Sequence, residues 1–318
     1  MAVSVITSTD ELDQIAPQWD ALWRRSPQAT PFQSPHWLLP WWRSFGSDAP
    51  FVVMSSTNGK LEALAPLYIL RDEDSDESLG MFIGTGISDY LDILGDPEPL
   101  ADAIASADCQ LWDFQQLRPT SSLLSMPLRD GWSDNVEEQE PCPILALDDL
   151  DQSLSTHARK KLRYYRRCAE RLGEVRYETA NADSLDALLQ SLFELHAARW
   201  QRRGLPGVLA DETTQQFHRD AARRMLDAGA LRMYAMHIGN RVRGVFYGFA
   251  HHDTVYYYLS GYDPDLEKIS IGNTLVAHAV DEAIRDGAKV FDFLRGAEEY
   301  KYAWGAKDRM NRRRQMFR

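Results

Sequence analysis

The stretch that determines the fold runs from Tyr256 to Ala283 and reads YYYLSGYDPDLEKISIGNTLVAHAVDEA. Its tyrosine-rich start is typical of a β-strand that ends near Gly261. From Gly272 onward apolar residues recur at helical spacing, which predicts an amphipathic helix over 272–286. The unpaired N–H groups that begin such a helix can hold an anion such as a pyrophosphate, although Ser and Gly are also ordinary helix caps. We assign the anion-binding role to Ser270, Ile271, Gly272, Asn273 and Thr274.

On either side of this stretch the sequence predicts alternating strands and helices. The second half reads strand, helix, helix, three strands, helix and strand, and a basic helix precedes it. This order predicts an α/β fold in which an antiparallel meander leads into a strand, a loop and a helix. The predicted strands are 174–178, 231–237, 242–250, 255–261 and 290–294, and the further helices are 153–172, 184–202 and 212–228.

The first half predicts a similar mixture of strands and helices. Asn58-Gly59 is a strong signal for a tight hairpin turn. The run 71–78 is polar and acidic and predicts a mobile loop, and polar residues at 148–153 indicate a boundary between domains 1–150 and 151–318. The predicted strands are 3–7, 51–55, 61–70, 111–117 and 144–147, with helices beginning at Thr9 or Asp10 and at Pro35.

Composition excludes several classes of protein. The chain has 318 residues and a formal net charge of −12, which argues against a general nucleic-acid binder. Local basic runs at 157–167 and 307–318 suit a small anionic ligand, or form a solvated helix face and a solvated tail. The three cysteines (Cys109, Cys142 and Cys168) have no disulfide or zinc-site spacing, so we expect no metal. With no signal-peptide pattern and no long apolar run, we expect a cytoplasmic protein without a transmembrane segment.

Aromatic residues concentrate near the start of the chain, where Phe32, Trp37, Trp41 and Trp42 lie at helical spacings. This spacing favours a packed core or a domain interface. The alternative is a platform on which a sugar or a lipid stacks.

Further motifs follow one another along the chain. They are Pro31–Trp37 with Trp41 and Trp42, Arg159–Arg167, Leu195–Trp200, Tyr258–Pro264, Ser270–Gly272, and Phe291–Gly296 followed by Glu298, Tyr300, Lys301 and Trp304. In this order they resemble the GNAT-related acetyltransferase family linked to bacterial cellulose biosynthesis, the CelD/BcsL type. The resemblance implies two GNAT-like lobes with mixed central sheets flanked by helices. It also implies transfer of an acyl group, in the first instance acetyl, from acyl-CoA to a small-molecule amine in envelope, polysaccharide or lipid biosynthesis.

Amine acylation requires a group that takes a proton from the amine and an acid for the departing thiolate. The resemblance makes His196 our first choice for acid–base work. Asp292 or Glu298 is a further candidate base, and Tyr300 is the candidate acid. An alternative is that Asp292 and Glu298 belong to a structural salt-bridge network with a nearby arginine. The candidate acceptor-binding residues are Arg199, Tyr258, Arg295 and Lys301.

Two rival functions stay open at this point. Fem-type aminoacyltransferases have a paired GNAT-like architecture and use aminoacyl-tRNA, and the basic helix at 159–171 would then line a tRNA groove. The other rival is a non-catalytic, GNAT-shaped scaffold in polysaccharide assembly, because Gly272 is the only glycine of the predicted phosphate loop. The sequence does not identify the acceptor, the acyl length or the oligomeric state.

Overall fold

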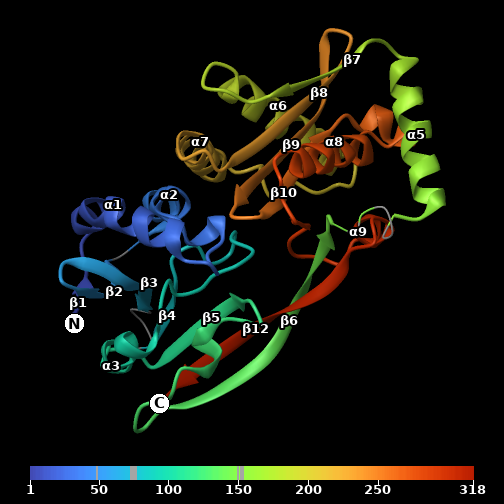
Figure 1. The fold of residues 1–318 in the computed structure, drawn as a ribbon. Helices are drawn as coiled ribbons and strands as arrows, with labels where there is room; N and C mark the ends of the chain where they lie inside the picture. Colours follow the sequence, from blue (N-terminus) through green and yellow to red (C-terminus); the bar gives the residue numbers. More distant parts are fainter. Residues whose placement is uncertain (48, 72–76, 149, 151–153) are drawn as a thin grey trace. The chain divides into compact units, whose positions relative to one another are not determined.

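The computed structural model describes residues 1–47, 49–71, 77–148, 150 and 154–318, which form two compact units (Figure 1). Unit 1 comprises Met1–Pro141 and Arg309–Arg318, and unit 2 comprises Cys142–Asp308. Unit 2 thus begins before the predicted boundary at 150, and the last residues of the chain return to unit 1. Residues 72–76 of the predicted acidic loop, and 149 and 151–153 of the predicted boundary, lie outside the described residues.

Unit 1 is a mixed sheet with helices. Its hydrogen-bonded strand order is β1-β2-β3-β4-β5-β12-β6, in which β4 and β5 are parallel. The predicted hairpin turn is confirmed, since Asn58 and Gly59 join β2 and β3 with φ angles of 54° and 77°. The elements are β1 (Ala2–Ile6), α1 (Thr9–Arg25), η1 (Pro31–Gln33), α2 (Pro35–Phe45), β2 (Pro50–Thr57), β3 (Lys60–Arg71), β4 (Ser78–Phe82), η2 (Glu98–Leu100), α3 (Ala101–Ala105), β5 (Leu111–Leu117), η3 (Ser122–Ser125), β6 (Ser133–Ala146) and β12 (Lys307–Phe317).

The aromatic residues of α2 and η1 pack inside unit 1. Phe32 and Trp37 are fully buried, and their rings meet edge to face with centroids 5.4 Å apart. The indole N–H of Trp37 donates to Ser88 Oγ at 2.9 Å, so its polar group is satisfied within the core. Trp41 and Trp42 are also buried. The prediction of a packed core is confirmed.

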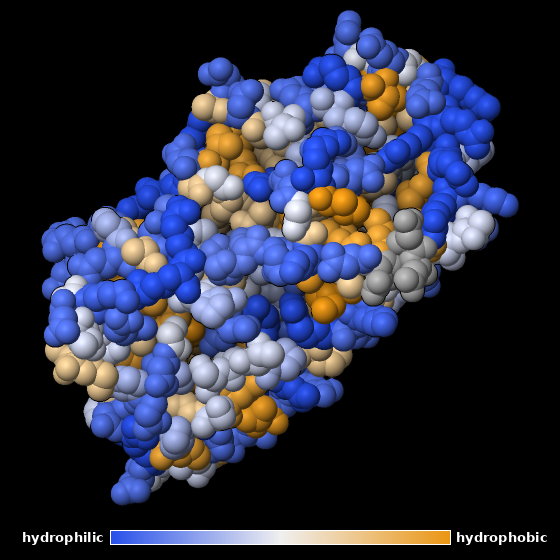
Figure 2. Space-filling view, in the orientation of Figure 1, coloured by the Kyte–Doolittle hydropathy of each residue, from blue (hydrophilic) through white to orange (hydrophobic). Residues whose placement is uncertain are grey.

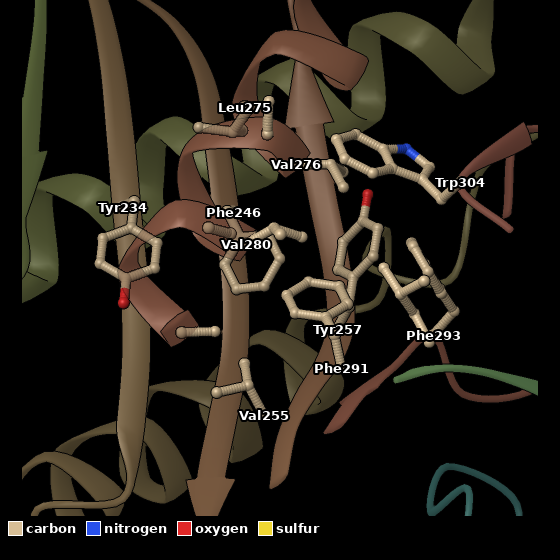
Figure 3. Close-up of a cluster of buried hydrophobic side chains, with 14 of the residues drawn as sticks. Tyr234, Phe246, Val255, Tyr257, Leu275, Val276, Val280, Phe291, Phe293 and Trp304 are labelled. Carbon is tan, nitrogen blue, oxygen red and sulfur yellow. The ribbon is translucent and has the colours of Figure 1, made fainter. Parts of the chain in front are cut away.

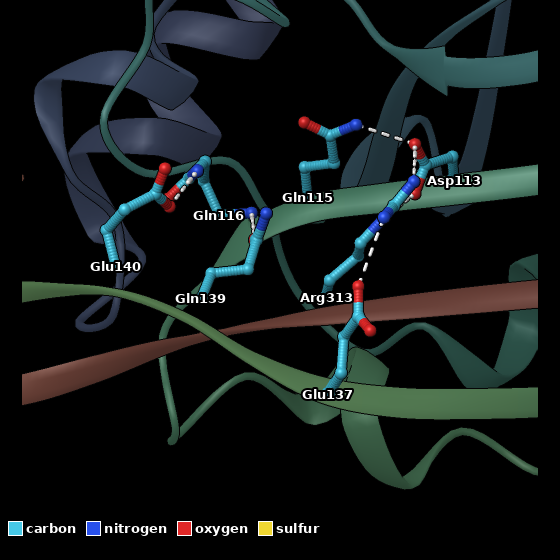
Figure 4. Close-up of polar contacts among 7 residues, drawn as sticks. All are labelled: Asp113, Gln115, Gln116, Glu137, Gln139, Glu140 and Arg313. Carbon is cyan, nitrogen blue, oxygen red and sulfur yellow. Dashed lines mark hydrogen bonds and ion pairs between the residues drawn. The ribbon is translucent and has the colours of Figure 1, made fainter.

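The expectation of a solvated tail at 307–318 is wrong, because these residues form strand β12. Arg313 pairs with Asp113, with Nε 2.5 Å from Oδ1, and with Glu137 at 3.1 Å (Figure 4). Arg314 is only 3% exposed and pairs with Asp134 at 2.7 Å. Acids distant in the sequence therefore neutralise the positive charges of this strand, which a local reading of its composition does not reveal.

Unit 2 has the strand order β6-β11-β10-β9-β8-β7, in which β10 and β11 are parallel and the other neighbours antiparallel. Its strand β6 continues from unit 1. The predicted α/β class is confirmed, and no helix in the described ranges has the length and apolar composition to span a membrane. The further elements are α5 (Thr156–Glu170), β7 (Val175–Thr179), α6 (Leu185–Gln201), α7 (Glu212–Asp227), β8 (Leu231–Ile238), β9 (Arg241–His251), β10 (Thr254–Tyr262), η4 (Pro264–Ile269), α8 (Ile271–Arg285), β11 (Val290–Asp292) and α9 (Glu299–Ala303).

Helices α6 and α8 cover opposite faces of the unit 2 sheet. A Cβ at Gly261 of β10 would meet the Leu192 carbonyl of α6 at 2.8 Å, so glycine is needed where this helix crosses the strand. A Cβ at Gly244 of β9 would meet Ile271 of α8 at 3.1 Å. Between the sheet and α8 lies an apolar core around Phe246 (Figure 3). Both helices are therefore fixed against β9 and β10.

Candidate functional site

The central feature of unit 2 is the point at which β10 and β11 separate. The two strands pair in parallel from Thr254 with Val290 to Tyr256 with Asp292, where β11 ends. Strand β10 continues to Tyr262, and its register against β9 shifts between Tyr257 and Leu259, which is a β-bulge. Past Tyr256, β10 therefore has an edge that does not pair with β11. Such an edge presents backbone N–H and C=O groups to a ligand that lies along it.

The loop after β10 leads into α8 through an unusual backbone conformation. Ser270 is left-handed (φ 52°, ψ 52°), and its carbonyl accepts the N–H of Thr274 at 3.2 Å. Residues 271–273 lie before this first hydrogen bond of the helix. Their N–H groups have no acceptor within the helix and lie at the positive end of its dipole. A Cβ at Gly272 would lie 3.1 Å from Cε1 of Tyr262, so the glycine allows the helix to begin close to that ring.

The five predicted anion-binding residues do not all present their side chains. Ile271 is fully buried and Thr274 is 1% exposed, so both belong to the core. Asn273 Nδ2 donates to Ser270 Oγ at 2.9 Å, which stabilises the turn. Binding by this segment therefore depends on backbone N–H groups, and the role of all five residues stays a prediction.

Three hydroxyl groups gather beside the separating strands. The Tyr257 and Ser260 hydroxyls of β10 lie 2.5 Å apart, and the Tyr257 hydroxyl also hydrogen-bonds Tyr300 of α9. Figure 3 shows the Tyr257 ring between Phe291 and Phe293, with its hydroxyl on the side of Trp304. Burial raises the pKa of both tyrosines, so both hydroxyls are protonated at neutral pH. Sequence reasoning missed Tyr257 and Ser260.

Arg199 of α6 reaches the same region. Its guanidinium carbon lies 4.5 Å from the centroid of the Tyr262 ring, which is a cation–π contact. Its buried Nε has no hydrogen-bond partner among the described residues. The positive charge of Arg199 lowers the pKa of Tyr257 and of Tyr300, and this partly offsets the increase that burial causes. Arg199 is thus a cation beside the hydroxyl groups with one donor unused, which suits its predicted contact with an anionic part of a substrate.

His196, one turn earlier on α6, is 3% exposed. Burial, and then the charge of Arg199, lower its pKa to about 4, so the ring is neutral at pH 7. Its Nδ1 is buried and has no hydrogen-bond partner in the described part of the chain. A Cβ at Gly207 would lie 2.7 Å from its Cε1, so the backbone closes tightly over the ring. A neutral imidazole with an unused nitrogen can accept a proton, directly or through a water molecule.

The predicted site residues that follow β11 lie in or beside one tight turn. Lys301 is 2% exposed, and its ammonium donates to the carbonyls of Leu294 (3.1 Å), Arg295 (2.7 Å) and Gly296 (3.0 Å). It also pairs with Glu298 at 2.9 Å. This saturated environment favours a structural role for Lys301, and its contact with an acceptor stays a prediction.

The remaining predicted residues lie around this turn and on the opposite sheet face. Asp292 is fully buried and its Oδ1 accepts the Leu294 N–H at 2.9 Å, whereas the Glu298 side chain is 58% exposed. The half-buried Arg295 belongs to the turn. Tyr258 lies near His218, with ring centroids 5.6 Å apart. The structure therefore places Tyr258 on the side of the sheet that α6 and α7 cover, whereas Tyr257 lies on the side of α8.

A pocket of about 660 Å³ lies along the exposed side of α6. Two of its carboxylates are already paired, Asp265 with Arg202 and Asp263 with Arg243, whereas Glu194 forms no ion pair among the described residues. No group of three or more metal-binding side chains occurs within the described residues. The pocket is lined by Ser191, Glu194, Leu195, Ala198, Gln201, Arg202, Val242, Asp263, Pro264 and Asp265.

Comparison with known proteins agrees with this geometry. Residues 156–302 match the family model described as an acetyltransferase (GNAT) domain. The structure is similar to that of FemX, with a TM-score of 0.71, 11% identity and coverage of 99% of this chain and 97% of that chain. It also resembles L-PGS from Bacillus licheniformis, with a TM-score of 0.56, 12% identity and coverage of 88% and 91%. No curated protein matches the sequence.

A further similar structure is the C-terminal domain of a protein described as a lysylphosphatidylglycerol synthetase from Agrobacterium fabrum. Its TM-score is 0.62 at 11% identity, over 96% of this chain and 92% of that chain. At such low identity these likenesses establish the fold alone. Beside this likeness of fold stands the match of residues 156–302 to the acetyltransferase (GNAT) domain model.

Proposed function

We propose that this chain moves an acyl group from an acyl-CoA thioester to a primary amine. The observation that carries the proposal is the separation of β10 from β11 past Tyr256, because β10 continues to Tyr262, whose ring lies against Gly272 at the start of α8. An extended acyl carrier that lies along the free edge of β10 would place its phosphates at the helix start. Its thioester would then lie next to the hydroxyl groups of Tyr257 and Tyr300.

The proposed reaction is direct transfer. The amine nitrogen attacks the thioester carbon, the new C–N bond forms, and the C–S bond breaks. A backbone N–H on the free edge of β10 polarises the carbonyl oxygen. The Tyr300 hydroxyl, paired with Tyr257, protonates the departing thiolate, and its raised pKa ensures that the hydroxyl carries its proton before the reaction.

An alkylammonium acceptor must lose two protons, one before its nitrogen attacks and one from the nitrogen of the new amide. One of them restores the Tyr300 hydroxyl, and the other needs a base. The neutral imidazole of His196 is the proposed acceptor, with the exposed carboxylate of Glu298 as the alternative. Arg199 is proposed to hold an anionic part of the substrate through its unused donor. Glu194 of the α6 pocket is the carboxylate that supports an acceptor that arrives as a cation, as an alkylammonium does at pH 7. Cytoplasmic location and a task in envelope, polysaccharide or lipid biosynthesis belong to the same proposal.

A ligand screen by thermal unfolding tests the identity of the donor. Acetyl-CoA, longer acyl-CoAs, free CoA and an aminoacyl-tRNA are compared at equal multiples of the protein concentration. A ligand present at 100 times its dissociation constant adds about 2.7 kcal/mol to the free energy of unfolding. We expect stabilisation by acyl-CoA, followed by amine-dependent release of free thiol.

Two outcomes would contradict the proposal. Stabilisation by aminoacyl-tRNA without any by CoA compounds would favour the Fem-type alternative, for which the likeness to the FemX fold is the supporting observation. If no donor stabilises the protein and no thiol is released, the non-catalytic scaffold is the better description. The acyl-CoA with the largest stabilisation identifies the acyl length.

A further inference from the structure

Helix α5 carries a strongly basic outer face. Lys160, Arg163, Tyr164, Arg167 and Arg171 lie at successive helical spacings and point away from the core, and we call this set the α5 face. The opposite side of the helix, with Ala158, Leu162 and Ala169, packs against the apolar core of unit 2. The side on which α5 lies in Figure 1 is strongly hydrophilic in Figure 2.

The cations of the α5 face have no acidic partner in the part of the chain that the structure describes. Arg166, at the edge of the face, pairs with Asp281 of α8 at 2.7 Å. By contrast, the four cations of the face form no ion pair with an acid among the described residues. The only acid of α5 is Glu170. In a chain whose net charge is −12, such a concentration of unpaired positive charge points to an external anionic partner.

The α5 face also exposes apolar surface. The Tyr164 side chain lies in the middle of the cations and is 54% exposed, and Leu172, directly after the helix, is 56% exposed. Tyrosine and leucine beside a row of cations are typical of helices that lie in the headgroup region of a membrane. The cations attract the lipid phosphates, while the apolar groups enter the boundary with the acyl chains.

We propose that the α5 face binds the surface of a bilayer that contains anionic phospholipid. The row of cations from Lys160 to Arg171 is straight and about 17 Å long, at about 1.5 Å per residue, so it can touch a flat surface along its whole length. An RNA backbone would instead favour a groove that follows its curvature, and it would leave Leu172 without a partner. The inference is independent of the proposed acyl donor, because it requires only this helix.

Co-sedimentation with vesicles tests the proposal in the full-length protein. One set of vesicles contains phosphatidylcholine alone and the other also contains phosphatidylglycerol. We expect binding to the anionic vesicles, weaker binding as salt concentration rises, and little binding to the neutral ones. Replacement of three cations by Lys160→Gln, Arg163→Gln and Arg167→Gln should weaken the partitioning on the order of a hundredfold.

A matched variant removes the same charge elsewhere in unit 2. Its changes are at three exposed cations: Arg241→Gln, Lys289→Gln and Lys307→Gln. This control should keep at least most of the vesicle binding. A second variant, Leu172→Ser with Tyr164→Ser, should weaken binding while leaving its salt dependence unchanged, because it removes apolar area and no charge.

Several results would overturn the proposal. Binding to neutral vesicles as strong as to anionic ones would remove the role of charge. An equal loss of binding in the control variant would show that net charge, rather than the α5 face, is responsible. If the protein binds a structured RNA and not the vesicles, and the α5 variant loses the RNA, then the face is a nucleic-acid site. Circular dichroism of each variant establishes that the helix is retained.

Discussion

The substitution Gly272→Glu gives the sharpest test of the proposed donor site. It places a carboxylate in the first turn of α8, where the phosphates of an acyl-CoA are proposed to bind. A negative charge in the first turn interacts favourably with the helix dipole and stabilises the helix by about 0.3–1 kcal/mol. The new Cβ would approach Tyr262 Cε1 to 3.1 Å, a tight contact that this half-buried ring relieves by a small shift. We therefore expect a folded protein of nearly unchanged stability.

The loss of donor binding follows from Coulomb repulsion. Two unit charges about 4 Å apart interact with about 1 kcal/mol in water and about 4 kcal/mol at an effective dielectric constant of about 20. A diphosphate brings two such charges close to residue 272, so binding should weaken by at least about 2 kcal/mol, or about thirtyfold. At a concentration that gives about 2.7 kcal/mol of stabilisation in the unaltered protein, the variant should gain about 0.9 kcal/mol or less.

Thermal unfolding with and without acyl-CoA measures both quantities in one experiment. The matched control is Gln216→Glu, which adds the same charge at an exposed position of α7. The control should keep the full ligand-induced stabilisation. If the Gly272→Glu variant is stabilised by acyl-CoA as strongly as the unaltered protein, the start of α8 is not the phosphate site.

Three further predictions concern the turn after β11, the hydroxyl pair and the buried histidine. Lys301→Met should lower the free energy of unfolding, measured by urea titration, by about 3–5 kcal/mol, because three carbonyls lose a buried cationic donor. Unchanged stability together with a raised KM for the amine would instead show that Lys301 contacts the substrate. Tyr300→Phe should lower kcat about tenfold to a hundredfold and keep donor-induced stabilisation, so an unaltered kcat would exclude Tyr300 as the acid. Because the folded-state pKa of His196 is about 4, below its usual 6.5, the unfolded chain binds more protons between these values, and stability falls as pH falls from about 6.5 to about 4. Urea titrations at each pH measure this loss. Between these pH values the His196→Gln variant should lose less stability than the unaltered protein, by up to about 3 kcal/mol, and equal pH dependence of the two proteins would contradict the assignment.

Long periodic elements of the fold follow from the sequence. Helix α8 was predicted over 272–286 and spans Ile271–Arg285, because its apolar residues recur on one face that packs on the sheet. The meander of β8, β9 and β10 follows from short β-rich runs separated by turn residues. In these segments the local preference and the tertiary environment agree, which is why periodicity alone is sufficient.

Strand β12 was missed because its stability depends on distant partners. Its run of arginines has no apolar alternation, so local composition indicates a solvated tail. The strand forms because Arg313 and Arg314 meet acids of β5 and β6 that lie far away in the sequence. Long-range charge pairing of this kind leaves no periodic signal.

The candidate site was only partly predictable for a related reason. The resemblance pointed to the segments that carry His196, Arg199 and Tyr300, and the structure brings the latter two together near Tyr257. The bulge of β10 and the hydrogen bond from Tyr257 to Tyr300 depend on strand pairing, which a single sequence does not specify. Likewise, a lysine near a strand end resembles a substrate contact until three carbonyls are found around Lys301.

The return of the chain to unit 1 has a consequence for synthesis on the ribosome. Strand β12 lies beside β5 in the sheet of unit 1, yet it is translated after all of unit 2. During synthesis one edge of β5 therefore has no strand to pair with until β12 has been translated and has left the exit tunnel. A fragment that ends after α9 would thus lack a strand of unit 1, which is synthesised first, although it contains almost all of unit 2.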